Sequence, residues 1–124
     1  MRVKNVKIAI KSLDDMTKEA MEVMEKLSRG EKVKKHVGVY FENVEAFRKV
    51  LTDKRLELLH TIRVKHPFSI YALSKMLGRD EKNVTGDLNY LKEVGLVELK
   101  KSKEGRERTI LSVPYEKIQL EISI

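Results

Sequence analysis

A tight junction between two helical segments constrains this chain most. Apolar residues recur at helical spacing from Ser69 to Leu77, and a second helical pattern begins at Asp80. Gly78 lies between them, where a left-handed backbone conformation ends a helix most easily. The turn Gly78-Arg79-Asp80 is therefore short enough to hold the two helices at a large angle.

The elements around this junction complete a recognisable order. Thr52 is suited to cap a preceding helix over 53–66, and the helix that begins at Asp80 ends at Gly95. Strands over 96–101 and 109–113 follow, joined by a glycine-containing turn. Three short helices followed by a hairpin are typical of a winged helix-turn-helix.

The apolar positions of these three helices form stripes that we expect to be core. The predicted core positions are Leu56, Leu59, Ile62, Val64, Ile70, Leu73, Met76, Leu77, Val84, Leu88, Leu91 and Val94.

The first half has its own pattern of alternating elements. Residues 3–11 alternate as a strand, Ser12 caps a helix that Gly30 ends, 32–41 alternate as a second strand, and 42–51 form a short helix. The first of these helices carries a further stripe that we interpret as core: Met16, Ala20, Val23, Met24 and Leu27. In the tail, Ile118, Leu120, Ile122 and Ile124 share a face.

The fold class predicted is therefore α+β, a winged helix-turn-helix with an N-terminal strand-helix-strand-helix extension. We divide it into a dimerisation or partner module, 1–51, and a DNA-binding domain, 52–124. Because 1–51 is small for a core of its own, we expect it to pair with a second protomer, with the strand 118–124 joining its sheet.

Composition excludes several classes of function. The chain has no cysteine, so disulfides and thiolate sites are excluded, and its 36% charged residues resemble proteins built for high temperature. It has no apolar run long enough for a membrane helix and no signal-peptide pattern, which predicts a cytoplasmic protein. His36, His60 and His66 are dispersed, and no nucleophile with a base or phosphate loop is recognisable. We predict no enzyme, metal or cofactor.

The net charge of +7 suits a polyanionic partner, although the charge is spread along the chain. Residues 1–51 hold 12 basic and 8 acidic side chains, and 52–124 hold 14 and 11, so the excess is +4 and +3. Charge alone therefore does not locate a binding surface. The position of the surface is inferred from the helix-turn-helix pattern instead.

The helix that begins at Asp80 has an outward side that is small, polar and basic near its start. At about 100° per residue, the candidate DNA contacts fall away from the apolar stripe or on its flanks: Lys82, Asn83, Thr85, Gly86, Asn89 and Tyr90. Lys82 can bond a guanine edge or a phosphate, and Asn83 or Asn89 can pair with adenine. Lys82 and Asn83 as an ordinary solvated first turn remain the alternative.

Gly86 and Arg79 are further candidate DNA contacts, and each can also be judged by its effect on the helix. A glycine within a helix costs roughly 1 kcal/mol relative to alanine, a cost that close approach to a DNA groove would explain. Arg79 is a candidate phosphate contact, and a salt bridge between Arg79 and Asp87 that holds the helix is the alternative.

The hairpin and the start of the middle helix supply further candidates. The wing carries basic residues that could lie along the phosphate backbone or enter the minor groove: Lys101, Lys103, Arg106 and Arg108. Ser69, at a helix start, is a candidate contact to the DNA backbone. Because glutamates are interspersed in the hairpin, a merely soluble turn stays open as an alternative.

The segment from Leu51 to Leu99 resembles a prokaryotic family of winged-helix transcriptional regulators, distantly MarR-like. The residues that carry the resemblance are Leu51, Thr52, Arg55, Leu58, Leu59, Ser69, Ile70, Gly78, Arg79, Asp80, Asn83, Val84, Asp87, Leu91, Gly95 and Leu96. The preceding strand-helix-strand is also similar, and the chain departs from the pattern at Gly86. Some members resemble TumA-type antitoxins, which implies autoregulation and a toxin partner.

Three hypotheses follow. The first is a sequence-specific regulator that binds double-stranded DNA as a homodimer on a pseudo-palindrome. The second is an antitoxin-type module that neutralises a partner toxin and regulates its own operon. The third is a winged helix that serves as a scaffold in a larger transcription assembly.

Overall fold

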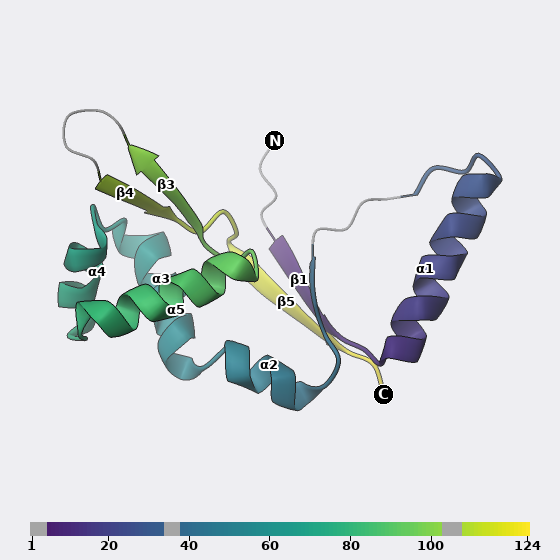
Figure 1. Ribbon diagram of the computed structural model, residues 1–124, viewed down its shortest axis with the longest axis horizontal. Helices are drawn as coiled ribbons and strands as arrows, with labels where there is room; N and C mark the ends of the chain where they lie inside the picture. Colours follow the sequence, from purple (N-terminus) through teal and green to yellow (C-terminus); the bar gives the residue numbers. More distant parts are fainter. Residues whose placement is uncertain (1–4, 34–37, 103–107) are drawn as a thin grey trace.

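The computed structural model describes residues 5–33, 38–102 and 108–124, and its fold is α+β (Figure 1). Within these ranges the elements are, in chain order, β1 (Asn5–Ile10), α1 (Leu13–Ser28), β2 (Gly38–Phe41), α2 (Val44–Val50), α3 (Asp53–Lys65), α4 (Ile70–Leu77), α5 (Glu81–Glu93), β3 (Glu98–Ser102), β4 (Arg108–Ser112) and β5 (Lys117–Ile122). This is the predicted winged helix-turn-helix with a strand-helix-strand-helix extension.

The helix-turn-helix begins and ends where local backbone chemistry predicts. The Thr52 hydroxyl accepts a hydrogen bond from the Arg55 amide at the start of α3, and the Ser69 hydroxyl accepts one from the Ala72 amide at the start of α4. Gly78 ends α4 with a φ of 64°, the left-handed conformation that glycine adopts without strain. The junction to α5 is therefore as short as the sequence predicts.

The wing is an antiparallel hairpin of β3 and β4 that projects beyond the helices (Figure 1). Leu99 pairs with Leu111, and Leu111 is buried in the core. The base of the hairpin is thus anchored by apolar packing. Its tip, 103–107, lies outside the described residues.

The first half and the C-terminal strand share one parallel sheet, in the order β2-β1-β5. Ile8 of β1 pairs with Val39 of β2 on one side and with Leu120 of β5 on the other. The expectation that the C-terminal strand joins this sheet is confirmed, and it does so within the chain. The predicted strand 32–41 was too long at its start, because 32–33 lie in no strand and 34–37 lie outside the described residues.

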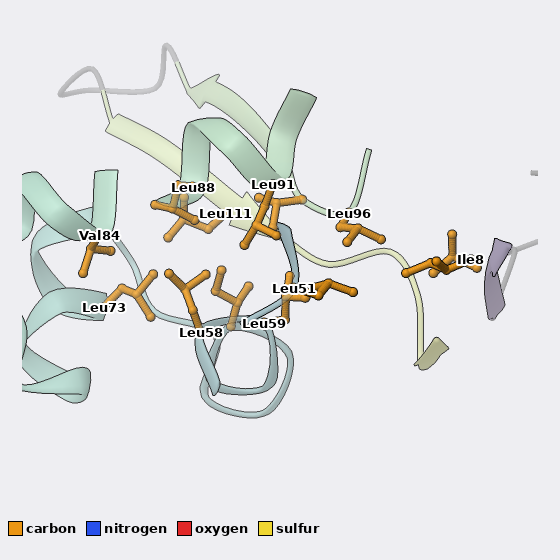
Figure 2. Packing of buried hydrophobic residues seen from close by; sticks show 13 residues of the cluster. Ile8, Leu51, Leu58, Leu59, Leu73, Val84, Leu88, Leu91, Leu96 and Leu111 are labelled. Atoms are coloured by element: carbon orange, nitrogen blue, oxygen red, sulfur yellow. The ribbon is translucent and has the colours of Figure 1, made fainter. Parts of the chain in front are cut away.

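One apolar cluster connects the sheet to the helices. Figure 2 shows it running from Val84 and Leu73 among the helices, through Leu96, to Ile8 on β1. Phe41 of β2 and Phe47 of α2 meet edge to face, with ring centroids 5.8 Å apart. The helices and the sheet therefore rest on a continuous core.

Three predicted core positions are wrong. Leu56 and Val64 of α3 and Met76 of α4 are exposed, whereas Leu58, which was not in the predicted stripe, is completely buried. At about 100° per residue, Leu58, Leu59 and Ile62 fall within one narrow arc of α3, and Leu56 and Val64 fall outside it. The apolar residues of α3 span more of its circumference than the core covers.

The apolar stripe of α1 is not core either. No residue of α1 is buried, and Met24 and Leu27 are 70% and 58% exposed. The helix stands apart from the sheet at one side of the molecule (Figure 1). Its charged side faces the sheet instead, where Lys11 donates to Glu19 at 2.7 Å. The space between α1 and the sheet is lined by charged side chains together with Val23, Val33 and Tyr40, so it offers the helix little apolar surface on which to pack.

We predict that Leu58→Ala lowers the free energy of unfolding by about 2–5 kcal/mol, because it opens a cavity in the core. Leu56→Ala, two residues away on the same helix and 43% exposed, should cost well under half as much. Urea denaturation of both variants measures this difference. Equal losses would contradict the orientation of α3.

Candidate nucleic-acid interface

The outward side of α5 is largely exposed. Val84, Leu88 and Leu91 are completely buried, which fixes the opposite side of the helix toward solvent. The predicted contact residues that are exposed are Lys82, Asn83, Gly86, Asn89 and Tyr90. Thr85 is half-buried on the flank, and its hydroxyl donates to the Glu81 carbonyl. The structure therefore brings these six residues together along one helix.

Asp80 lies immediately before α5, where a capping hydrogen bond is expected. It occupies the position before the first helical residue, yet its side chain accepts no hydrogen bond from the first turn. The helix therefore begins where the sequence predicts, but without a side-chain cap from Asp80. Glu81 contributes a negative charge to the same turn, and its interaction with the helix dipole stabilises α5.

Asp87 is the centre of an ion cluster that holds α5 in place. Arg55 of α3 donates to one carboxylate oxygen at 3.1 Å, and Arg79 of the turn donates to the other at 2.7 Å. Burial raises the pKa of this carboxyl, but the hydrogen bonds from Arg79 and Arg55 outweigh it, so the pKa lies below its usual value. Asp87 stays ionised and connects α5 to α3 and to the turn that precedes α5.

Arg79 is engaged within the protein. The salt bridge to Asp87 that the sequence left open is present, and the Arg79 side chain is only 20% exposed. Its Nη1 atom is buried without a hydrogen-bond partner among the described residues. A phosphate contact by Arg79 stays a prediction.

Arg55 connects the ion cluster to the end of α2 and to Tyr90. Its Nη1 donates to the carbonyls of Lys49 and Val50 at the end of α2, both at 2.8 Å. Its guanidinium lies 4.4 Å from the centroid of the Tyr90 ring, a cation–π distance. Tyr90 is therefore held against α3 and not loose on the surface.

Gly86 has no packing reason to be glycine. It lies in the middle of α5, and a Cβ atom built there would meet nothing within 4 Å. Its φ is also outside the left-handed range. The protein's own structure therefore does not require glycine at this position.

The predicted wing residues are only partly described. Lys101 of β3 is exposed near the end of the hairpin. Arg108 begins β4, and only its backbone is described, while Lys103 and Arg106 lie outside the described residues. At the start of α4, the Ser69 hydroxyl is used as a cap, and its DNA contact stays a prediction.

Tyr71 and Lys75 on α4 were missed by the sequence analysis. Both are exposed, and the Lys75 ammonium lies 5.4 Å from the Tyr71 ring centroid. Together with Gly78, Arg79 and Glu81 they line a shallow depression between α4 and the start of α5. Asp80 also lines this depression, so two carboxylates lie beside the basic groups of Lys75 and Arg79. The spacing of four residues between Tyr71 and Lys75 on the polar side of α4 was the available signal.

The described residues carry neither a metal-binding cluster nor a membrane-spanning helix. No group of three His, Asp or Glu side chains in 5–33, 38–102 and 108–124 is arranged to hold a metal ion. In the same ranges, no helix combines the length and apolarity that crossing a membrane requires.

These elements define a winged helix-turn-helix protein whose α5 presents a polar outward side. The family model that describes HVO_A0114 proteins matches residues 50–120, which include the whole helix-turn-helix and most of β5. The chain belongs to the HVO_A0114 family. No curated protein matches it.

We predict that Asp87→Asn lowers the free energy of unfolding by about 2 kcal/mol, because two half-buried guanidinium groups lose their carboxylate. A carboxyl with a lowered pKa stabilises the fold above its unfolded pKa of about 3.9 and loses that contribution as pH falls through the folded value. The wild-type chain should therefore lose more stability than the variant below about pH 4.

Urea denaturation between pH 3 and 7 measures both effects. Asp80→Asn is the matched control, because the Asp80 side chain makes no cap hydrogen bond. Equal stability of the Asp87 and Asp80 variants would show that the cluster contributes nothing.

Proposed function

We propose that this chain is a regulator of transcription that binds double-stranded DNA sequence-specifically, with α5 in the major groove and the β3–β4 wing on the backbone. It acts as a homodimer on a pseudo-palindromic site, in the cytoplasm, and without a catalytic centre or cofactor. The exposed N-terminal half of α5 supports this proposal, because in helix-turn-helix proteins that end of the helix contacts base edges.

The charges of α5 support the same orientation. Lys82 lies in the first turn on the outward side, and Glu93 lies at the far end of that side. Asp87 does not repel phosphates, because Arg55 and Arg79 neutralise it. On the outward side itself, the positive charge of α5 therefore lies at its start, although Asp80 and Glu81 place two carboxylates beside it.

Gly86 is the observation that carries the proposal. It weakens α5 by roughly 1 kcal/mol, and nothing in the protein's own packing requires it. A close approach of an external surface to the helix backbone would explain a residue without a side chain. The neighbours Lys82, Asn83 and Asn89 give that surface hydrogen-bonding groups suited to bases and phosphates.

A second candidate function is an antitoxin-type module that binds a partner toxin and regulates its own operon. The exposed apolar stripe of α1 favours it, because such a surface is typical of a helix that docks on another protein. Co-purification of the protein encoded by a neighbouring gene, lost on Met24→Glu and retained on Lys82→Ala, would support this function.

We predict that Gly86→Ala raises the free energy of unfolding by about 1 kcal/mol and weakens binding to a selected DNA duplex about tenfold. Alanine favours the helix, while its methyl group separates the helix backbone from the DNA. Urea denaturation and fluorescence anisotropy measure the two effects. Glu93→Ala, at the far end of α5, is the control for binding. If the variant gains stability and binds DNA as tightly as the wild type, DNA does not approach the helix backbone at Gly86.

We predict that Lys82→Ala weakens specific binding by about 1–3 kcal/mol if Lys82 contacts a base. If it contacts only phosphate, the loss is similar for all sequences and the salt slope falls by about one unit. Titrations of specific and unrelated duplexes at several salt concentrations separate these cases. Lys92→Ala removes the same charge from the last turn of α5 and should change neither quantity. An unchanged titration with Lys82→Ala would exclude it from the interface.

A further inference from the structure

The edge strand β5 is unusually open for an apolar strand. All six of its residues are exposed, and Ile118, Leu120 and Ile122 are 37%, 47% and 48% exposed. Within the described residues β5 is hydrogen-bonded to β1 alone, so its other edge carries unpaired backbone groups. An apolar edge strand of this kind is a template for a further strand.

The sequence of β5 is complementary to itself when it is read in the opposite direction. Lys117-Ile118-Gln119-Leu120-Glu121 places a positive charge at one end, a negative charge at the other, and apolar residues symmetrically about Gln119. In an antiparallel pair centred on Gln119, Lys117 lies opposite Glu121 of the second copy and Ile118 lies opposite its Leu120. Opposite charges and apolar pairs across strands are the contacts that stabilise such a pair.

We propose that β5 of one chain pairs antiparallel with β5 of a second copy, with Gln119 on the twofold axis. The two three-stranded sheets then form one continuous six-stranded sheet. This inference deepens the proposed function, on which it rests for the expectation that the chain self-associates. The occupant of the edge is a second copy and not another protein, because the charge pattern of β5 is its own complement.

The surroundings of β5 fit this arrangement. Glu121 is already paired with Lys7 of β1 at 2.6 Å, whereas Lys117 has no ion pair with any described residue. Lys117 of the second copy would therefore meet a carboxylate that is ordered on the sheet, and each Lys117 would gain a partner.

An apolar cleft lies where the second strand would lead. It has a volume of about 200 Å³ and is lined by Leu56, Leu59, Val113, Tyr115 and Ile118, among others. Arg63 fixes its rim by donating to the Val113 carbonyl and pairing with Glu116. In the antiparallel pair, the last residues of the second copy run past Lys117 toward this cleft. This arrangement would cover three apolar side chains that are exposed in the single chain. They are Ile122 and Ile124 of the second copy and Leu56 of the first.

Charge reversal tests the pairing directly. In Lys117→Glu, two attractive pairs across the axis become repulsive, and the same holds for Glu121→Lys, so each variant should raise the dimer dissociation constant roughly 10- to 100-fold. Mixed together, the two variants face each other with opposite charges at both positions and should form a one-to-one dimer. Lys54→Glu, an equal charge change on α3, should leave the dimer unaltered.

Analytical ultracentrifugation of the 124-residue chain measures these states, and circular dichroism checks that each variant is folded. Variants that stay as dimeric as the wild type, or a mixture that does not dimerise, would overturn the proposal. A dimer that survives Lys117→Glu but dissociates with Met24→Glu would place the interface on α1 and would overturn it as well.

A disulfide gives a second, independent measurement. Residues opposite each other in an antiparallel pair have Cα atoms about 4.5–5.5 Å apart, within the range that a disulfide spans. The chain has no cysteine, so Gln119→Cys introduces a single thiol. Oxidation should convert it to a covalent dimer, whereas Ile122→Cys, which is not opposite itself, should remain largely monomeric under denaturing electrophoresis. Equal cross-linking of the two variants would contradict the register.

These outcomes are distinguishable from failure of the proposed function. A dimer that responds to charge reversal but binds no duplex would retain the β5 pairing and exclude the regulator. A monomer that still binds specific DNA through Lys82 would exclude the β5 pairing and retain the regulator.

Discussion

The carboxylate of Asp87 is the interaction on which the arrangement of the helix-turn-helix depends. The apolar core supplies most of the stability, but apolar contacts alone allow helices to slide and rotate. Asp87 removes that freedom, because it receives hydrogen bonds from Arg55 on α3 and from Arg79 in the turn before α5. Arg55 continues to the carbonyls at the end of α2 and to the ring of Tyr90. This half-buried carboxylate thereby holds α5 in the orientation that its buried apolar stripe defines.

The extension has the opposite character, because its apolar surface exceeds what the chain itself can cover. β1 is central in its sheet and its apolar side is buried, whereas the apolar side of β5 and the stripe of α1 remain exposed. Glu19 of α1 pairs with Lys11 beside the sheet, while Met21 and Met24 of the same helix remain exposed. A chain with these surfaces is suited to association, and the symmetric charge pattern of β5 specifies a second copy.

The elements set by local chemistry could be predicted from the sequence. The caps at Thr52 and Ser69, the glycine stop at Gly78 and the stripe of α5 depend on residues within a turn of one another. Exposure of α1 could not be predicted, because periodicity shows that a helix has an apolar side and not what covers it. The bond between Arg55 and Asp87 joins residues 32 positions apart, and only the fold brings them together. The outward residues of α5 were predictable because its buried stripe is unambiguous.

The central claim is that the outward side of α5 meets DNA. Its most direct test is to select a duplex from a random library and to follow the backbone amides by NMR during titration with that duplex. The account predicts the largest changes between Lys82 and Asn89, with α1 unaffected. Changes confined to α1 or the sheet, with the amides of α5 unmoved at saturation, would contradict it.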